Sequence, residues 1–165
     1  MQGPTHLVAG ICLQKAMMRV MPPSPLRYLL VALLALLIHG ILDRLAKFTY
    51  HPTKPLWKDH FWMAYNVILA LATIYILVLY WRGYWFVSIF SIAPDFDWVM
   101  MNLSGYLGFL PYKRPFLHDK LFRIIDSILT PSRTRFLPNW NLKRKGVLVE
   151  LLLLAILIFI IVMID

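Results

Sequence analysis

Long apolar runs separated by short polar segments dominate this sequence. About 20 apolar residues are needed to cross a hydrocarbon core of roughly 30 Å, so runs of this length predict membrane-spanning helices. A weaker run over residues 5–21 predicts a helix that ends before Pro22, since proline cannot continue a helix. Together the runs predict an all-α integral membrane bundle of four to five transmembrane helices. The expected helices cover residues 5–21, 27–47, 60–81, 83–101 and 146–164.

The segment Trp81-Arg82-Gly83 separates two of these runs. Because a turn this short only reverses the chain, we expect the helices over residues 60–81 and 83–101 to form an antiparallel hairpin. The predicted helices use so much of the 165 residues that the chain forms a single membrane domain, residues 1–165. The one cysteine, Cys12, excludes a disulfide within the chain.

Composition supports a membrane protein, since 60% of the residues are apolar and the mean hydropathy is +0.67. Basic residues then predict its orientation: residues 102–145 carry nine Lys or Arg, and residues 44–58 carry four. Because basic loops stay on the cytoplasmic side, we expect both segments and the N-terminus in the cytoplasm, in a prokaryotic inner (plasma) membrane. The basic loop 102–145 would contact anionic lipid headgroups. It lacks the organised aromatic surface of a nucleic-acid site, so no nucleic acid is expected.

Several ionisable side chains lie at the ends of the apolar runs. Asp95 and Asp97 flank one aromatic residue, and acids kept at membrane depth usually pair or bind an ion. His39 and Asp43 are spaced i, i+4, so a helix presents both on one face. The predicted topology places all the candidates on the cytoplasmic side, which predicts one shared metal site. Its expected ligands are His6, His39, Asp43, Asp95 and His118.

Imidazole nitrogens with carboxylate oxygens suit a divalent metal, with zinc the best match and manganese or iron as alternatives. Each residue also has a structural alternative. Asp95 and Asp97 could cap a helix or pair with basic residues, and His39 could bond to a backbone carbonyl. His6 could follow an N-cap, and His118 could be an ordinary loop residue. His51 and His60 are expected at the surface rather than among the ligands.

Three short motifs resemble elements of the membrane-bound metal-dependent hydrolases, a family that includes LexA-binding inner-membrane proteins. They are His6 with the small-residue helix turn after it, Pro94-Asp95-Phe96-Asp97, and His39-Gly40-Ile41-Leu42-Asp43 leading to Tyr50-His51-Pro52. The resemblance implies a multi-helix membrane fold and zinc-dependent hydrolysis. The motifs are degenerate and reordered, since Trp98 stands where the family has a histidine and the His39 motif precedes the aspartates.

The expected function is therefore metal-dependent hydrolysis at the cytoplasmic membrane face, with a metal-bound water as the nucleophile. Asp97 or Asp119 would accept the proton. Nearby cations favour a lipid or another phosphorylated amphiphile as substrate; they are Lys113, Arg114, Lys120 and Arg123. A different class stays open: a non-catalytic accessory or structural subunit of a larger membrane complex that binds haem or chlorophyll through His39.

Overall fold

The computed structural model describes residues 2–52, 56–107, 115–128 and 139–164. These residues form α-helices and one short 3₁₀ turn, with no strand among them, which confirms the all-helical prediction. The helices are α1 (Gly3–Val20), α2 (Pro25–Leu45), α3 (His60–Leu107), α4 (Phe116–Ile128) and α5 (Gly146–Met163), and the 3₁₀ turn η1 (Ala46–Phe48) follows α2 directly.

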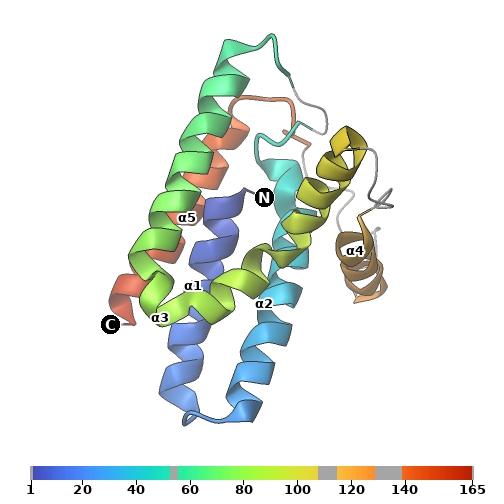
Figure 1. Cartoon of the computed structure of the whole chain (residues 1–165). Coiled ribbons are helices and arrows are strands. Elements are labelled where there is room, and N and C mark those ends of the chain that lie inside the picture. Colours follow the sequence, from blue (N-terminus) through green and yellow to red (C-terminus); the bar gives the residue numbers. More distant parts are fainter. Residues whose placement is uncertain (1, 53–55, 108–114, 129–138, 165) are drawn as a thin grey trace.

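Three segments of the described chain are long and apolar enough to cross a membrane: Pro25–Phe48, His60–Met101 and Gly146–Met163. They agree with a membrane protein, and the predicted total of four to five crossings stays a prediction. The remaining long helix, α1, lies between α2, α3 and α5 (Figure 1). Its first half is buried from Pro4 to Ile11, so α1 forms the centre of the bundle.

The connection between α1 and α2 is a short proline-rich turn. Ser24 caps α2, since its hydroxyl oxygen accepts the backbone N–H of Arg27 at 3.2 Å. Pro25 occupies the first turn of α2, where a missing N–H costs nothing. The Arg27 guanidinium donates to the carbonyl of Met21 at 3.1 Å and closes the turn. The turn therefore makes α1 and α2 antiparallel neighbours (Figure 1).

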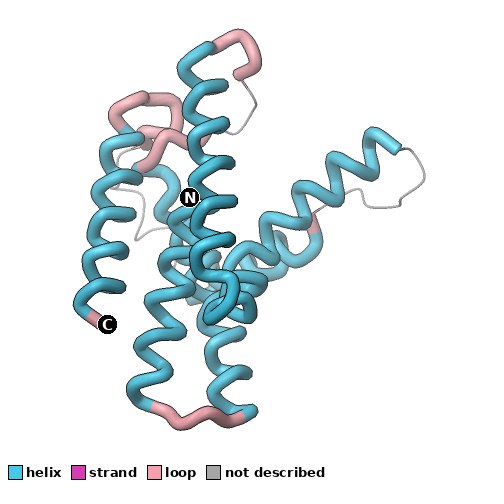
Figure 2. Tube along the Cα trace, turned by 60° about the vertical axis from the view of Figure 1, so that its left-hand side comes forward, coloured by secondary structure: helices cyan, strands magenta, loops and turns pink. Residues whose placement is uncertain are grey.

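Helix α3 differs from the prediction of two helices joined by a turn. It runs without interruption from His60 to Leu107, through Arg82 and Gly83. No proline lies at the expected turn, and a glycine inside a helix costs only about 1 kcal/mol, which is too little to end it. The helix instead bends in its middle (Figures 1 and 2). The Gln14 side-chain amide of α1 donates to the Gly83 carbonyl at 3.0 Å, and a side chain bonded into the helix ladder favours such a bend.

Both halves of α3 pack against α1, and the second half also packs against α2. Ile76 and Tyr80 of the first half pack with Val8 of α1, whereas Val87 of the second half packs with Val31 of α2 as well as with α1. Beyond this point α3 continues past α2 toward α4. The chain direction therefore changes near the predicted turn, although no turn is present.

Helix α4 and the end of α3 lie inside the segment that the charge density predicted as a loop over residues 102–145, so that prediction was wrong for residues 102–107 and 116–128. Residues 108–114 and 129–138 lie outside the described chain. Leu117, Leu121 and Ile125 are spaced i, i+4, i+8 and form an apolar stripe that a helix presents on one side. The many Lys and Arg residues around this short stripe concealed it.

Two glycines allow the helices to approach closely enough to build the site. A Cβ atom on Gly10 of α1 would lie 1.9 Å from the Ser91 hydroxyl oxygen of α3. A Cβ atom on Gly40 of α2 would lie 2.9 Å from side-chain atoms of Leu121 and Ile125 on α4. Small residues at such crossings let helix backbones meet. The crossings place α1, α3 and α4 against α2 near its C-terminal end.

Candidate metal centre

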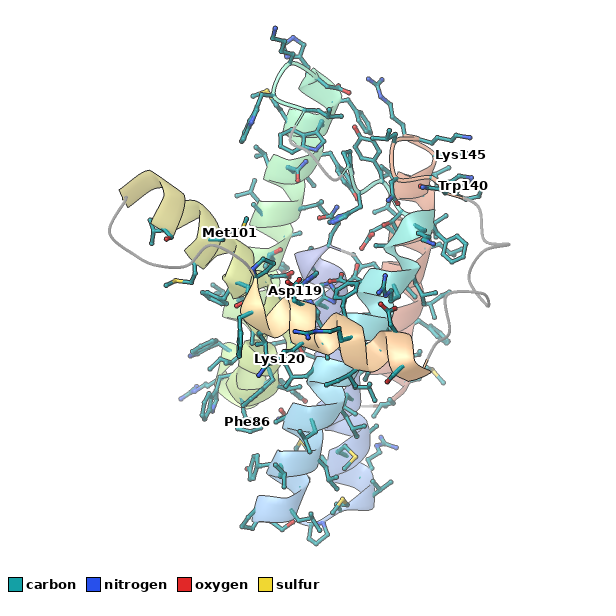
Figure 3. The ribbon with its side chains drawn as sticks, turned by 90° about the vertical axis from the view of Figure 1, so that its right-hand side faces the viewer. Phe86, Met101, Asp119, Lys120, Trp140 and Lys145 are labelled. Atoms are coloured by element: carbon teal, nitrogen blue, oxygen red, sulfur yellow. The ribbon has the colours of Figure 1, made fainter. Side chains whose placement is uncertain are left out.

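The five predicted ligands come from four helices, and the structure brings their side chains together. His6 lies in the buried first half of α1, and His39 and Asp43 lie near the C-terminal end of α2. Asp95 follows Pro94 inside α3, and His118 lies in the first turn of α4. Figure 3 shows α4 lying across α2 where these helices meet, with Asp119 and Lys120 labelled on α4.

The centre of the cluster is the carboxylate of Asp43, which faces three imidazoles. Its Oδ1 lies 3.1 Å from Nε2 of His6, and its Oδ2 lies 3.2 Å from Nε2 of His39 and 3.3 Å from Nε2 of His118. The rings of His6 and His39 are stacked, with their centroids 3.9 Å apart. One candidate ligand atom from each of His6, His39 and Asp43 lies within 4.8 Å of the others, which is a geometry that could hold a metal ion.

Asp95 completes the cluster from α3, with its Oδ1 3.7 Å from Nε2 of His39. Its side chain is 42% exposed, whereas the side chain of His39 is fully buried. Asp95 therefore lies at the open edge of the cluster and His39 at its closed end. The predicted roles of these five residues as metal ligands stay predictions.

The orientation of His39 is set by a backbone hydrogen bond. Nδ1 of His39 lies 2.7 Å from the carbonyl oxygen of Ser91, and only a protonated Nδ1 can donate to a carbonyl. Nε2 of the same ring then points at the carboxylates of Asp43 and Asp95. An unprotonated Nε2 facing two ionised carboxylates would be unfavourable, so this arrangement calls for a proton between these groups or a metal ion. Metal-bound histidines are typically oriented by such a bond from the other ring nitrogen.

The turn of α3 around Pro94 supplies two contacts to His39. Pro94 has no N–H to donate to the carbonyl of Phe90, which weakens the helix ladder in this turn. The carbonyl of Ser91 in the same turn accepts the His39 imidazole, since a carbonyl oxygen has two lone pairs. The same turn therefore supplies the Ser91 carbonyl and the acidic side chain of Asp95 to one cluster.

Asp97 holds α4 in place. Its Oδ2 accepts the backbone N–H of His118 at 2.7 Å, and its side chain is buried. An acidic acceptor at a helix N-terminus satisfies a free N–H and favours the helix dipole. This contact gives Asp97 a positioning role for His118. Asp119 is exposed in the same turn (Figure 3). The roles of Asp97 and Asp119 as proton acceptors stay predictions.

Glu150, the one acid of α5, fixes the first turn of α1. It is only 3% exposed, and its Oε1 accepts the backbone N–H of Gln2 at 3.2 Å and the hydroxyl of Thr5. Helix α1 has no side-chain cap of its own, so an acid from another helix takes that place. His6 follows Thr5 directly, and Glu150 therefore helps to position this candidate ligand.

A lone acid in an otherwise apolar membrane helix is costly and usually has a specific partner. The sequence therefore indicates that Glu150 faces a helix neighbour or the membrane interface, and the structure identifies that neighbour as α1. Sequence reasoning missed Gln2, whose side-chain amide donates to the Tyr50 carbonyl at 3.2 Å and lies 3.0 Å from Nδ1 of His51. Nothing in the spacing of Gln2 along the chain indicates these partners, because they come from a loop about fifty residues away.

A cavity of about 430 Å³ opens beside the cluster. It combines the site's acidic and imidazole groups with two cations from the end of α2. Its lining residues include Asp43, Asp95, His118, Arg44, Lys47, His51, Phe122 and Asn141. The expectation that His51 lies at the surface was wrong, since it is half-buried in this wall, whereas His60 is exposed as expected. Burial lowers the pKa of His51, so its imidazole is uncharged at neutral pH.

The basic wall of the cavity is anchored. The Arg44 guanidinium forms an ion pair with Asp126 of α4 and lies 4.4 Å from the centre of the Phe122 ring. The backbone carbonyl of Lys47 accepts the N–H of Trp140 at 2.6 Å, which ties this wall to the segment before α5. The cavity is therefore lined by basic residues as well as by the acidic cluster, and the Arg44 guanidinium is held in place by its partners.

Comparison with protein-family models, with curated proteins and with solved structures gave no match. The resemblance of the three short motifs to membrane-bound metal-dependent hydrolases therefore stays a prediction.

Proposed function

We propose that this protein is a metal-dependent hydrolase that acts on a lipid or another phosphorylated amphiphile at the cytoplasmic membrane face. One observation carries the proposal: Nε2 of the oriented His39 faces the carboxylates of Asp43 and Asp95 beside a cavity. His6 and His118 face the same Asp43 carboxylate. The cluster and the cavity together supply candidate ligands and room for a substrate.

The donor set fits a divalent cation. The imidazoles of His6, His39 and His118 with the Asp43 carboxylate suit zinc, and also manganese or iron, whereas magnesium and calcium prefer oxygen donors alone. We assign Asp95, which the sequence predicted as a fifth ligand, to proton transfer instead. We propose zinc because tetrahedral sites rich in histidine are typical of it. A bound zinc ion would lower the pKa of its water and polarise an ester or phosphoryl oxygen.

Other residues of the cluster and the cavity would transfer the proton, position a ligand and bind the substrate. Asp95 lies at the cavity edge, where its half-exposed carboxylate can accept a proton from an attacking water. Asp97 keeps His118 in the cluster through the backbone N–H that it accepts. Arg44 and Lys47 line the cavity and would attract an anionic headgroup, since fixed cations recognise phosphate oxygens. This charge pattern supports a phosphorylated amphiphile over a neutral one.

The geometry does not favour haem or chlorophyll on His39. One face of its ring is stacked on His6, its Nδ1 is bonded to Ser91, and its Nε2 is directed at Asp43. A large flat pigment needs an open approach to the ligating nitrogen, which the neighbouring carboxylates occupy. An optical spectrum of the purified protein tests this directly, because a Soret or red band would support the accessory-subunit alternative.

Elemental analysis of the purified protein tests the metal site. We expect stoichiometric zinc in the wild type and its loss in His39→Ala and Asp43→Asn. His60→Ala is the matched control, because His60 is exposed at the start of α3, away from the cluster, and the zinc content should not change. Unchanged zinc in both cluster variants would contradict the proposal.

Hydrolysis is tested separately with p-nitrophenyl phosphate and a short-chain phosphatidic acid in detergent. We expect release of p-nitrophenol or inorganic phosphate by zinc-loaded wild type, and loss of that activity in Asp95→Asn with metal retained. A zinc-loaded wild type that releases neither product would favour a non-catalytic subunit that keeps the metal for structure.

A further inference from the structure

Helix α4 has two different faces. Leu121 and Ile125 are buried against Gly40 of α2, and they fix its inner side. On the opposite side Phe116 is 58% exposed and Ile124 is 55% exposed. These two residues give the outer side of the helix an apolar surface that a second apolar environment can cover.

Cations share this outer face. Lys120 lies between Phe116 and Ile124 at i, i+4 spacing, and Arg123 lies on the same side of the helix. The Lys120 ammonium lies 4.1 Å from the centre of the Phe116 ring, so charge and apolar surface are next to each other. Of the two acids on α4, Asp126 is paired with Arg44, and Asp119 flanks the face. The face is therefore apolar and basic.

The position of α4 sets its depth. It lies across α2, one of the helices able to span a membrane, so it runs along the membrane plane rather than through it (Figure 3). It crosses at Gly40, five residues before α2 ends at Leu45 and eight before the apolar segment ends at Phe48, which is about 7.5–12 Å along a helix. Amphipathic helices lie about 5–10 Å into the boundary between headgroups and acyl chains, so α4 lies near that boundary rather than at the membrane centre.

We propose that the outer face of α4, made of Phe116, Lys120, Arg123 and Ile124, docks on a leaflet that contains anionic lipid. Phe116 and Ile124 enter the upper acyl region, and Lys120 and Arg123 contact the headgroups. A protein partner fits less well, because two apolar side chains interleaved with cations give little apolar surface for a stable interface.

Docking of α4 on lipid does not depend on metal binding. The two sites are neighbours, because His118 and Phe122 on the inner side of α4 line the cavity. A headgroup held by the outer face of α4 would therefore lie within one helix diameter of the cavity.

Fluorescence quenching in lipid nanodiscs tests the depth of α4. A bimane label is placed on Ile124→Cys after Cys12, which is half-buried in α1, is replaced by serine. Ile156→Cys on α5 is the lipid-facing control, and Leu142→Cys, at a residue 72% exposed in the segment before α5, is the aqueous control. We expect the label at residue 124 to be quenched by brominated lipid as at residue 156, and protected from iodide. Iodide quenching equal to that at residue 142 would overturn the proposal.

Lipid selectivity is tested in nanodiscs of phosphatidylcholine alone and of an equal mixture with phosphatidylglycerol. We expect the anionic mixture to increase brominated-lipid quenching at residue 124, and Lys120→Gln with Arg123→Gln to abolish that increase. Equal quenching at residue 124 in both nanodisc compositions would overturn the proposed preference for anionic lipid. Disulfide cross-linking of two chains through residue 124 would overturn lipid docking in favour of a second copy.

Discussion

At the scale of single residues, the carboxylate of Asp43 is the negative group that all three imidazoles of the candidate centre face. Its two oxygens lie within 3.3 Å of nitrogens from His6, His39 and His118, so one carboxylate serves three imidazoles. A neutral imidazole offers a lone pair to a metal, whereas a protonated imidazole offers only a proton to Asp43. Either a metal ion or protons on the imidazoles therefore occupy the space between Asp43 and the three histidines. A variant that removes the Asp43 charge distinguishes these two states.

Asp43→Asn should weaken zinc binding by more than about 100-fold, since the loss of a ligand exceeds the 10- to 100-fold effect of outer-shell changes. The affinity is measured by competition with a chromogenic chelator in detergent. Asp59→Asn provides a matched control, because Asp59 lies before α3 and pairs with Arg144 outside the cluster. Equal zinc affinities of Asp43→Asn and wild type would show that the Asp43 carboxylate is not a metal ligand and pairs with protonated histidines instead.

At the scale of elements, the N-terminus of α1 depends on α5. Glu150→Ala leaves the Gln2 N–H and the Thr5 hydroxyl without their acceptor, and each buried unsatisfied group costs about 1–3 kcal/mol. We expect a lower unfolding temperature and weaker zinc binding, because His6 loses its fixed position. Glu150→Gln keeps an acceptor oxygen and should recover part of both.

Leu152→Ala is the control for these measurements, since Leu152 is an exposed residue of the same helix. The two readouts separate stability from positioning. If Glu150→Ala lowered the unfolding temperature and left zinc affinity unchanged, Glu150 would stabilise the bundle without positioning His6.

The elements that the sequence predicted well are those with a clear local signal. Helices over residues 5–21, 27–47 and 146–164 lie within two residues of α1, α2 and α5, because prolines and charged segments bound them. The hairpin at Trp81-Arg82-Gly83 was wrong, since a glycine and a charge can indicate a turn but cannot enforce one. At the bend of α3, the Gly83 carbonyl accepts the amide of Gln14 from another helix, and no local pattern records such a contact.

The grouping of the five predicted ligands followed from helix periodicity and from the ends of the apolar runs. The i, i+4 spacing of His39 and Asp43 was sufficient to predict that pair. Although α3 is one bent helix rather than a hairpin, it still places Asp95 next to His39. The supporting residues could not be found in this way. Glu150 and His51 act through partners more than forty residues away, so their roles depend on how the helices pack.

At the scale of the whole molecule, the candidate centre joins α1, α2, α3 and α4 through side chains that meet at one point. An ion bound there would link four helices and favour the folded bundle over any state in which they separate. Zinc at about 100 times its dissociation constant adds about 2.7 kcal/mol to the free energy of unfolding. For a chain of this size that corresponds to a rise of about 5–10 °C in the unfolding temperature.

We therefore expect zinc to raise the unfolding temperature of chelator-stripped protein by this amount in detergent, as followed by intrinsic tryptophan fluorescence. His39→Ala should show little or no rise, because it removes the buried ligand, whereas His60→Ala should show the full rise. The stripped forms of wild type and His39→Ala are compared first, so that a general loss of stability is distinguished from a loss of metal response. A rise of equal size in His39→Ala would place the zinc effect elsewhere in the chain, because an ion that does not depend on His39 cannot act through this centre.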